Sequence, residues 1–288
     1  MKKIVIAGCG YIGTRVARAW KGRGAEVTCL VRSAGHRDAL AAEGFAARSC
    51  SFDDPAEVPA LDAAGCIIYY FVPPPGGGIA DSRARNFCAA LSLAAPPARI
   101  IYMSATSVYS ETGGGVVTED SPTEPHSAMG KRRLDAEQAF LDYGRTTGTP
   151  VIILRVSGIY GPGRLPLMQI SQGQPLLNEA ESGPSNRIHA DDLAAVCLAA
   201  ADRGEGGDIF NVSDGHPSSM TSYFNACADL LGYPRQPQVG MAEARRVMSP
   251  LMLSYVTDSR AVDNSRMIER LNIRLKYPTM LEGLQHCA

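Results

Sequence analysis

Short apolar runs alternate with segments of helical periodicity along the first half of the chain. In residues 11–23, Ile12, Val16 and Trp20 recur at every fourth position, which places them on one face of a helix. The intervening runs are apolar without alternation, a pattern typical of strands that are buried on both faces. The pattern predicts strands at 3–7, 26–31, 45–50, 66–72, 99–104 and 150–156, and helices at 11–23, 35–43, 80–93 and 129–143.

The second half is less regular. It predicts a helix at 191–201 that Asp191 or Asp192 caps, a strand at 209–212, and a helix at 221–231 that ends at Gly232. Alternating strands and helices favour an α/β fold in which right-handed crossovers join parallel strands. We therefore expect a Rossmann-type, doubly wound parallel sheet.

Composition excludes several classes of protein. The 288 residues carry a net charge of −1, so no overall field attracts nucleic acid or an anionic membrane. The apolar runs are far shorter than the roughly 18 residues of a membrane span, and the first stops at Gly8, too early for a signal peptide. The eight cysteines show no CxxC or metal-ligand spacing. We expect a cytoplasmic protein with no metal, membrane or nucleic-acid partner.

A glycine-rich turn joins the first strand to the first helix. The sequence Gly8-Cys9-Gly10-Tyr11-Ile12-Gly13 fits the GxGxxG pattern, which binds a dinucleotide when it lies inside a βαβ unit. Gly8 permits the tight turn, Gly10 admits the diphosphate, and Gly13 lets the helix pack on the strand. The amides of Tyr11 and Ile12, at the start of the helix, face the phosphates. The turn predicts NAD(P) binding; a purely structural turn is the alternative.

The residues after the second strand bear on the choice of dinucleotide. NAD sites usually place an acidic residue there, which binds the ribose 2′-hydroxyl. Here Arg32 and Ser33 follow the strand, and arginine pairs with a 2′-phosphate. We predict NADP, with NAD as the alternative, unless Arg32 is only a surface residue or stacks on adenine. Asp53 reaches the adenine amino group or caps the next turn, and Ser104 is a further cofactor-binding candidate.

Five further motifs resemble, in order, those of one family. They lie at Arg99–Tyr109, Thr118–Pro122, Leu154–Arg164, Arg187–Ala194 and Phe210–Val212. Over almost its whole length the chain resembles the extended short-chain dehydrogenases/reductases, the NAD-dependent epimerase/dehydratase family. The resemblance implies an NAD(P)-binding Rossmann domain at 1–160 with about 186–215, and a small C-terminal lobe at about 161–185 and 216–288. That lobe would bind a small-molecule substrate, often a nucleotide sugar. A homodimer through the helices at 80–93 and 129–143 is common in the family.

The chain departs from this family where the chemistry takes place. Met129 and Arg133 occupy the places of the catalytic tyrosine and lysine, and Ala105 occupies that of the serine or threonine. A thioether has no titratable proton and arginine stays charged, so neither residue performs the family's proton transfer. The substitutes that we consider are Thr106, Tyr109 and Tyr160, although the two tyrosines are better explained as packing residues or loop anchors. The remaining polar candidates are His126, Ser127, Lys131 and His189.

Two functions follow from these observations. The first is an NADP-dependent oxidoreductase, or a nucleotide-sugar epimerase or dehydratase, with a non-standard active site. The second is a catalytically inactive NADP-binding sensor or scaffold, which the loss of all three catalytic side chains favours.

Overall fold

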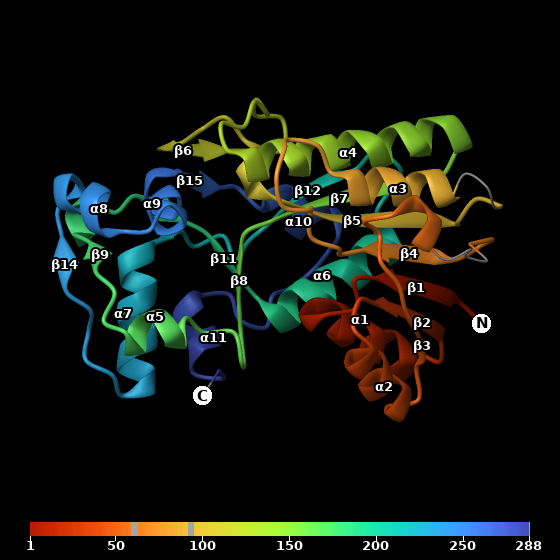
Figure 1. Ribbon diagram of the computed structural model, residues 1–288, viewed down its shortest axis with the longest axis horizontal. Helices are drawn as coiled ribbons and strands as arrows, with labels where there is room; N and C mark the ends of the chain where they lie inside the picture. The colour runs from red at the N-terminus through yellow and green to blue at the C-terminus, as the bar shows by residue number, and fades with distance from the viewer. Residues whose placement is uncertain (59–62, 92–94, 288) are drawn as a thin grey trace.

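The computed structural model describes residues 1–58, 63–91 and 95–287, and a parallel sheet of seven strands forms its centre (Figure 1). The strand order is β12-β7-β5-β4-β1-β2-β3, so the order reverses between β1 and β4. This sheet confirms the predicted doubly wound fold. The strands are β1 (Lys3–Ala7), β2 (Glu26–Val31), β3 (Ala46–Ser49), β4 (Ile67–Tyr70), β5 (Arg99–Ala105), β7 (Val151–Val156) and β12 (Ile209–Val212).

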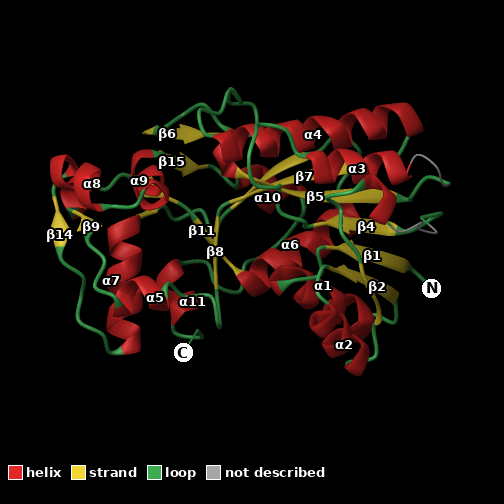
Figure 2. Ribbon diagram, viewed as in Figure 1, coloured by secondary structure: helices red, strands yellow, loops and turns green. Residues whose placement is uncertain are grey.

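Helices cover both faces of the sheet (Figure 2). One face carries α1 (Tyr11–Gly22), α2 (Ala34–Ala42), α6 (Ala190–Arg203) and α10 (Ser265–Arg270), and the other carries α3 (Ser82–Leu91) and α4 (Ala128–Thr147). Buried hydrogen bonds join helices α1 and α6 to strand β4 of the sheet. The Trp20 indole of α1 donates to the Tyr69 hydroxyl of β4 over 2.9 Å, and that hydroxyl donates to the Cys197 carbonyl of α6. Met267 of the late helix α10 and Leu271, which follows that helix, belong to the core on the face that α1 and α6 cover.

Capping residues explain where the helices begin and end. The predicted helix at 80–93 begins at Ser82, because the Asp81 carboxylate accepts a bond from the amide of Ala84; positions 92 and 93 lie outside the described residues. Helix α4 extends four residues beyond its predicted end, to Thr147, and stops at Gly148, whose φ is +74°. Helix α7 (Met220–Leu231) ends at Gly232 as predicted.

The predicted cap of α6 is wrong. His189 caps this helix, because its Nδ1 accepts a bond from the amide of Asp191 over 3.2 Å. The Asp192 carboxylate accepts instead from the amides of Lys276 and Tyr277, over 2.7 and 2.9 Å. Asp192 therefore fixes the chain that leads into the last helix, a contact over 84 residues that local sequence does not reveal.

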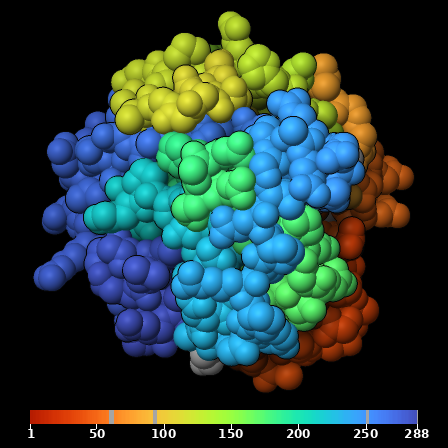
Figure 3. Space-filling model, turned by 90° about the vertical axis from the view of Figure 1, so that its left-hand side faces the viewer, coloured from red at the N-terminus to blue at the C-terminus, as the bar shows by residue number. Residues whose placement is uncertain are grey.

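A second group of elements lies beyond the carboxyl ends of the central strands, on the left of Figure 1. Figure 3 views the molecule from that side and shows the green segment, near residue 170, between blue segments from the last 70 residues. Their shared core includes Tyr160, Leu176, Phe224 and Met280. The helices are α5 (Leu167–Ser171), α7, α8 (Met241–Val247), α9 (Pro250–Thr257) and α11 (Met280–Leu284).

Short strands that the sequence analysis missed connect this group to the sheet. β8 (Gly158–Tyr160) pairs with β11 (Arg187–His189), and β6 (Gly113–Val117) pairs with β15 (Ser259–Val262). The other short pairs are β9 (Leu176–Leu177) with β14 (Gln238–Val239) and β10 (Pro184–Ser185) with β13 (Ser218–Ser219). In the described part of the chain, no helix has the length and apolar character that crossing a bilayer requires.

Candidate functional site

The three glycines of the first turn have different surroundings. Gly8 has φ +81°, and a Cβ there would lie 2.7 Å from the backbone nitrogen of Val72. A Cβ on Gly13 would lie 3.0 Å from the Gly8 carbonyl oxygen and 3.1 Å from the Ile6 side chain. A Cβ on Gly10 would meet no protein atom closer than 4.0 Å. The protein itself therefore requires glycine at 8 and 13, whereas the space beside Gly10 is open for a ligand.

Helix α1 begins directly behind this open space. Gly10 is its N-cap residue, no side chain caps it, and its first turn contains no acidic residue. The first amides of a helix have no acceptor within the helix and carry partial positive charge, so they attract anions. The amides of Tyr11 and Ile12 are among them. The open space and the uncapped helix fit the diphosphate of NAD(P) at the point where the strand order reverses.

The Tyr11 side chain joins this turn to the loop that follows β8. Its hydroxyl donates to the Pro162 carbonyl over 2.9 Å, and the Arg15 guanidinium stacks 4.0 Å from its ring centre. Arg164 approaches the same ring at 5.3 Å. Two segments that are 151 residues apart in sequence thus meet at Tyr11.

Arg32 and Ser33 lie at the end of β2, beside the N-terminus of α2. Arg32 is exposed and makes no hydrogen bond or ion pair with another described residue, so its guanidinium is open to a ligand; its charge is among those that lower the pKa of Asp53. The Ser33 hydroxyl accepts a long bond of 3.4 Å from the amide of His36 and caps α2.

Asp53 is held by an arginine of α3. Its carboxylate accepts two bonds from Arg83, over 2.6 and 3.1 Å, and this pairing lowers the pKa of Asp53. The expectation that Asp53 caps the following turn is wrong, because Asp54 caps it by accepting from the amide of Ala56 over 2.8 Å. Arg83 also donates to the Pro73 carbonyl, which ties the loop after β4 to the same carboxylate.

A buried polar network lies at the carboxyl end of β5, and it includes two predicted site residues. The Ser104 hydroxyl donates to Glu137 over 2.5 Å, and Glu137 accepts two bonds from Arg155. Arg155 also donates to the Tyr109 hydroxyl, which donates to Asn211 over 2.6 Å. Ser104 and Tyr109 are 2% and 1% exposed, so their hydroxyls bond to other buried groups rather than face a ligand. Burial raises the pKa of Tyr109.

Tyr160 is also fully buried. Its ring lies edge-on to His189 at 5.3 Å, its hydroxyl donates to the Thr279 carbonyl over 3.4 Å, and burial raises the pKa of that hydroxyl. Thr106 differs from both tyrosines, because it is half-buried directly after β5 and its hydroxyl bonds to no described residue. Of the three predicted catalytic residues, Thr106 alone presents a side chain that a substrate can reach.

Met129 and Arg133, which we predicted to occupy the places of the family's tyrosine and lysine, lie on the first turns of α4. The Met129 side chain is 48% exposed. Arg133 donates to the Met103 carbonyl over 2.8 Å, and Arg132 donates to the Gly78 carbonyl over 2.7 Å, so these two arginines bind backbone. Ser127 is engaged as the cap of α4. His126 and Lys131 are exposed.

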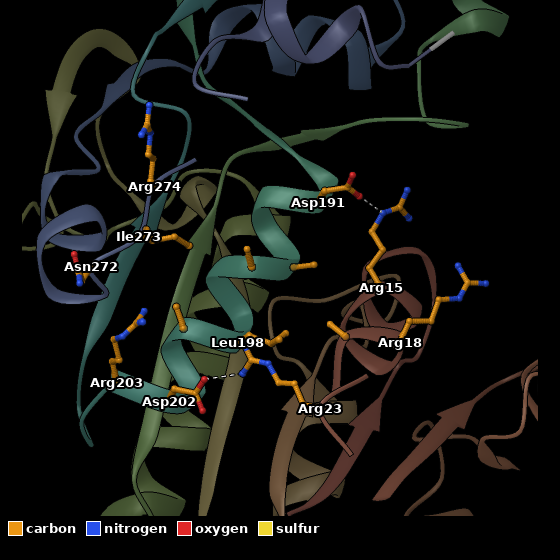
Figure 4. A pocket seen from close by; sticks show the side chains of 14 residues that line it. Arg15, Arg18, Arg23, Asp191, Leu198, Asp202, Arg203, Asn272, Ile273 and Arg274 are labelled. Atoms are coloured by element: carbon orange, nitrogen blue, oxygen red, sulfur yellow. Dashed lines mark hydrogen bonds and ion pairs between the residues drawn. The ribbon is translucent and has the colours of Figure 1, made fainter. Parts of the chain in front are cut away.

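A groove of about 590 Å³ lies elsewhere, on the outer side of α1 and α6 (Figure 4). Alanine and leucine side chains of α6 form its floor. Three of its arginines pair with acidic residues, Arg15 with Asp191, Arg18 with Glu43 and Arg23 with Asp202. The groove runs along the helical layer rather than across the carboxyl ends of the strands. We therefore do not assign it as the active site. Its arginines are Arg15, Arg18, Arg23, Arg203 and Arg274.

Comparison with protein families supports the resemblance seen in the sequence. Residues 80–213 match the family described as the NAD dependent epimerase/dehydratase family. The chain is 27% identical to Protein YeeZ of Escherichia coli (strain K12) over 292 residues, which cover 98% of each chain. It is 24% identical to a 3-diazoavenalumate denitrifying reductase of Streptomyces sp over 99% of each chain.

Solved structures show the same fold. A functionally unknown conserved protein from Silicibacter pomeroyi is 28% identical, with a TM-score of 0.83 over 99% of this chain and 97% of that one. The UDP-glucuronic acid 4-epimerase of Bacillus cereus in complex with NAD is 18% identical, with a TM-score of 0.76 over 100% of this chain and 97% of that one. The predicted resemblance to the epimerase/dehydratase family is confirmed.

Proposed function

We propose that the protein is an NADP-dependent oxidoreductase that transfers hydride between the nicotinamide and a small-molecule substrate of the nucleotide-sugar class. The observation that carries this proposal is the open space beside Gly10 in front of the uncapped helix α1. The epimerase from Bacillus cereus, which shares this fold, was solved with NAD.

The cofactor would be held by groups from three segments. The amides of the glycine turn, including those of Tyr11 and Ile12, would bind the diphosphate. Arg32 would pair with a 2′-phosphate, because its guanidinium is exposed and unpaired among the described residues, and Ser33 lies beside it. Asp53 remains a candidate for the adenine amino group. When bound, the cofactor supplies or accepts the hydride.

Hydride transfer to an acceptor suits the residues on α4 better than epimerisation does. Oxidising an alcohol with NAD(P)⁺ requires a base that takes the hydroxyl proton as the hydride leaves. Met129 has no such function, and Arg133 is charged and bound to the Met103 carbonyl. Reduction of an acceptor by NADPH needs a proton donor instead, and we assign Thr106 the role of passing this proton from solvent to the acceptor. The similarity to a reductase over 99% of both chains supports this choice.

A second candidate function is a non-catalytic NADP-binding sensor or scaffold. The burial of Tyr109 and Tyr160 favours it, because neither phenol reaches a substrate directly. A homodimer through α3 and α4 would suit either function and stays a prediction.

The test combines binding with turnover. Purified protein is mixed with NADPH and then with carbonyl compounds and nucleotide sugars, while the reduced nicotinamide is followed by its absorbance. Oxidation that Thr106→Val reduces, and that Tyr160→Phe does not, supports the oxidoreductase. Tight NADPH binding with no turnover across the panel supports the sensor. If neither NADPH nor NADH binds at millimolar concentration, both functions are wrong.

A further inference from the structure

Three buried polar side chains on neighbouring backbone segments each have one polar atom without a hydrogen-bond partner among the described residues. The unpartnered atoms are Ser157 Oγ, Arg187 Nε and Asp214 Oδ2. Backbone bonds bring these residues together, because the Asp214 amide donates to the Arg187 carbonyl over 2.7 Å, and Arg187 pairs with Gly158 between β11 and β8. We call Ser157, Arg187 and Asp214 the Arg187 cluster.

The Arg187 cluster lies at the edge of the sheet where a ligand is expected. Ala105 at the end of β5 pairs with Val156 at the end of β7, and the chain continues through Ser157 to Gly158. The cluster is thus one or two residues beyond the carboxyl ends of β5 and β7. Ligands of doubly wound sheets bind outside the carboxyl ends of the strands.

Arg187 carries a buried charge that no acidic side chain neutralises by contact. It is 7% exposed, its guanidinium stacks 3.9 Å from the ring centre of Tyr223, and one of its nitrogens donates to Ser185 over 3.3 Å. Arg187 forms no ion pair with any residue that the structure describes. Burial lowers the pKa of Arg187, and it raises the pKa of Asp214 to about 6. The Asp214 carboxylate attracts the guanidinium through space but forms no hydrogen bond with it. A buried charge without a contacting partner is costly until a partner arrives.

The free end of the guanidinium reaches exposed backbone. Nη1 of Arg187 makes no hydrogen bond to a described residue, and it lies 2.7 Å from the position that a Cβ on Gly158 would occupy. Gly158 itself is exposed. Because Gly158 has no side chain, a ligand that lies over its backbone can approach Nη1.

We propose that Arg187 binds an anionic group of the substrate, a carboxylate or a phosphate oxygen, that lies over Gly158. This inference rests on the proposed function, because the ligand is the substrate of that site. Guanidinium donors bind both kinds of oxygen strongly, and stacking on Tyr223 holds the plane of the group before the ligand arrives.

The experiment measures the affinities of defined probes by calorimetry. The probes are UDP-glucose, UDP-glucuronate and glucuronate. We expect Arg187→Gln to weaken binding by about tenfold or more, the usual loss when a bond to a charged group is removed. Arg187→Lys keeps part of the affinity, and Gly158→Ala weakens it because a methyl group occupies the approach to Nη1. The matched control is Arg245→Gln, which removes an exposed arginine of α8 and leaves the affinity unchanged.

The affinities of the probes distinguish a phosphate from a carboxylate as the group that Arg187 binds. An equal loss for UDP-glucose and UDP-glucuronate identifies a phosphate, whereas a loss confined to the glucuronates identifies a carboxylate. The inference is wrong if no probe binds the wild-type protein at millimolar concentration, or if Arg187→Gln and Gly158→Ala bind as wild type does. If Arg187→Gln does not fold, Gly158→Ala decides. NADPH affinity, measured on the same proteins, reports separately on the proposed function.

Discussion

The clearest prediction separates cofactor binding from folding within one glycine turn. Gly10→Ala places a methyl group where no protein atom lies within 4.0 Å, so the fold accommodates it. Alanine is a poor N-cap residue, and we expect a loss of about 1 kcal/mol or less in the free energy of unfolding. Gly8→Ala, in contrast, places a Cβ 2.7 Å from the Val72 nitrogen at φ +81°. Strain and overpacking there cost roughly 2–5 kcal/mol.

Gly10→Ala, which the fold accommodates, should nevertheless strongly weaken the binding of NADPH. The methyl group at position 10 occupies the space of the diphosphate and holds it away from the amides of α1. Losing two bonds to a charged group corresponds to about 3 kcal/mol, or about a 100-fold weaker affinity. Urea unfolding without cofactor gives the stabilities, and NADPH fluorescence gives the affinities. Wild-type NADPH affinity in folded Gly10→Ala would refute the assignment of this turn as the diphosphate site.

Three further predictions concern other parts of the chain. Arg32→Glu should lower the affinity for NADPH by about tenfold relative to that for NADH, because a carboxylate that repels the 2′-phosphate replaces a guanidinium that binds it. If competition titrations give the same ratio of the two affinities as in the wild type, Arg32 does not select NADP. Tyr109→Phe should cost about 1–3 kcal/mol in urea unfolding, because the bonds to Asn211 and Arg155 are lost; a stability equal to that of wild type contradicts the network. Burial lowers the pKa of His189, so as the pH falls the unfolded chain takes up a proton before the folded protein does, and the free energy of unfolding should decrease below about pH 6.5. His189→Asn keeps a capping side chain and should reduce this dependence of stability on pH. An unchanged dependence in the variant argues against His189 as its source.

The periodic elements were predictable from the sequence, and the short ones were not. Strands β1, β2, β5 and β7 follow from runs of apolar residues, because burial against two helical layers dictates their composition. Helix α1 follows from the recurrence of apolar residues at every fourth position. Strand β6 begins Gly113-Gly114-Gly115, which has no apolar pattern, and its partner β15 lies about 145 residues further along the chain. Only the folded chain brings such segments together.

The site was predicted in part, for a related reason. The glycine turn is a local motif, so it joins β1 to α1 as expected, and its role as the cofactor site stays a prediction. Tyr109 and Tyr160 were considered as reactive phenols, yet both are buried, because their partners come from distant segments. The sequence did contain one signal for the buried network, since Arg155 interrupts the apolar strand Val151–Val156. A charge inside such a strand requires a buried partner, and Glu137 is that partner.

The way in which α4 is anchored has a consequence for protein engineering. The ion pair between Arg155 and Glu137 ties the middle of this helix to the sheet, and Ser127 fixes its first turn, so the backbone at 129 does not depend on the side chain there. Met129 is half exposed and Arg133 binds only one carbonyl and a tyrosine hydroxyl. Met129→Tyr with Arg133→Lys therefore calls for no remodelling of the scaffold, so the double variant can show whether these two positions support the proton transfer that the predicted resemblance assigns to them.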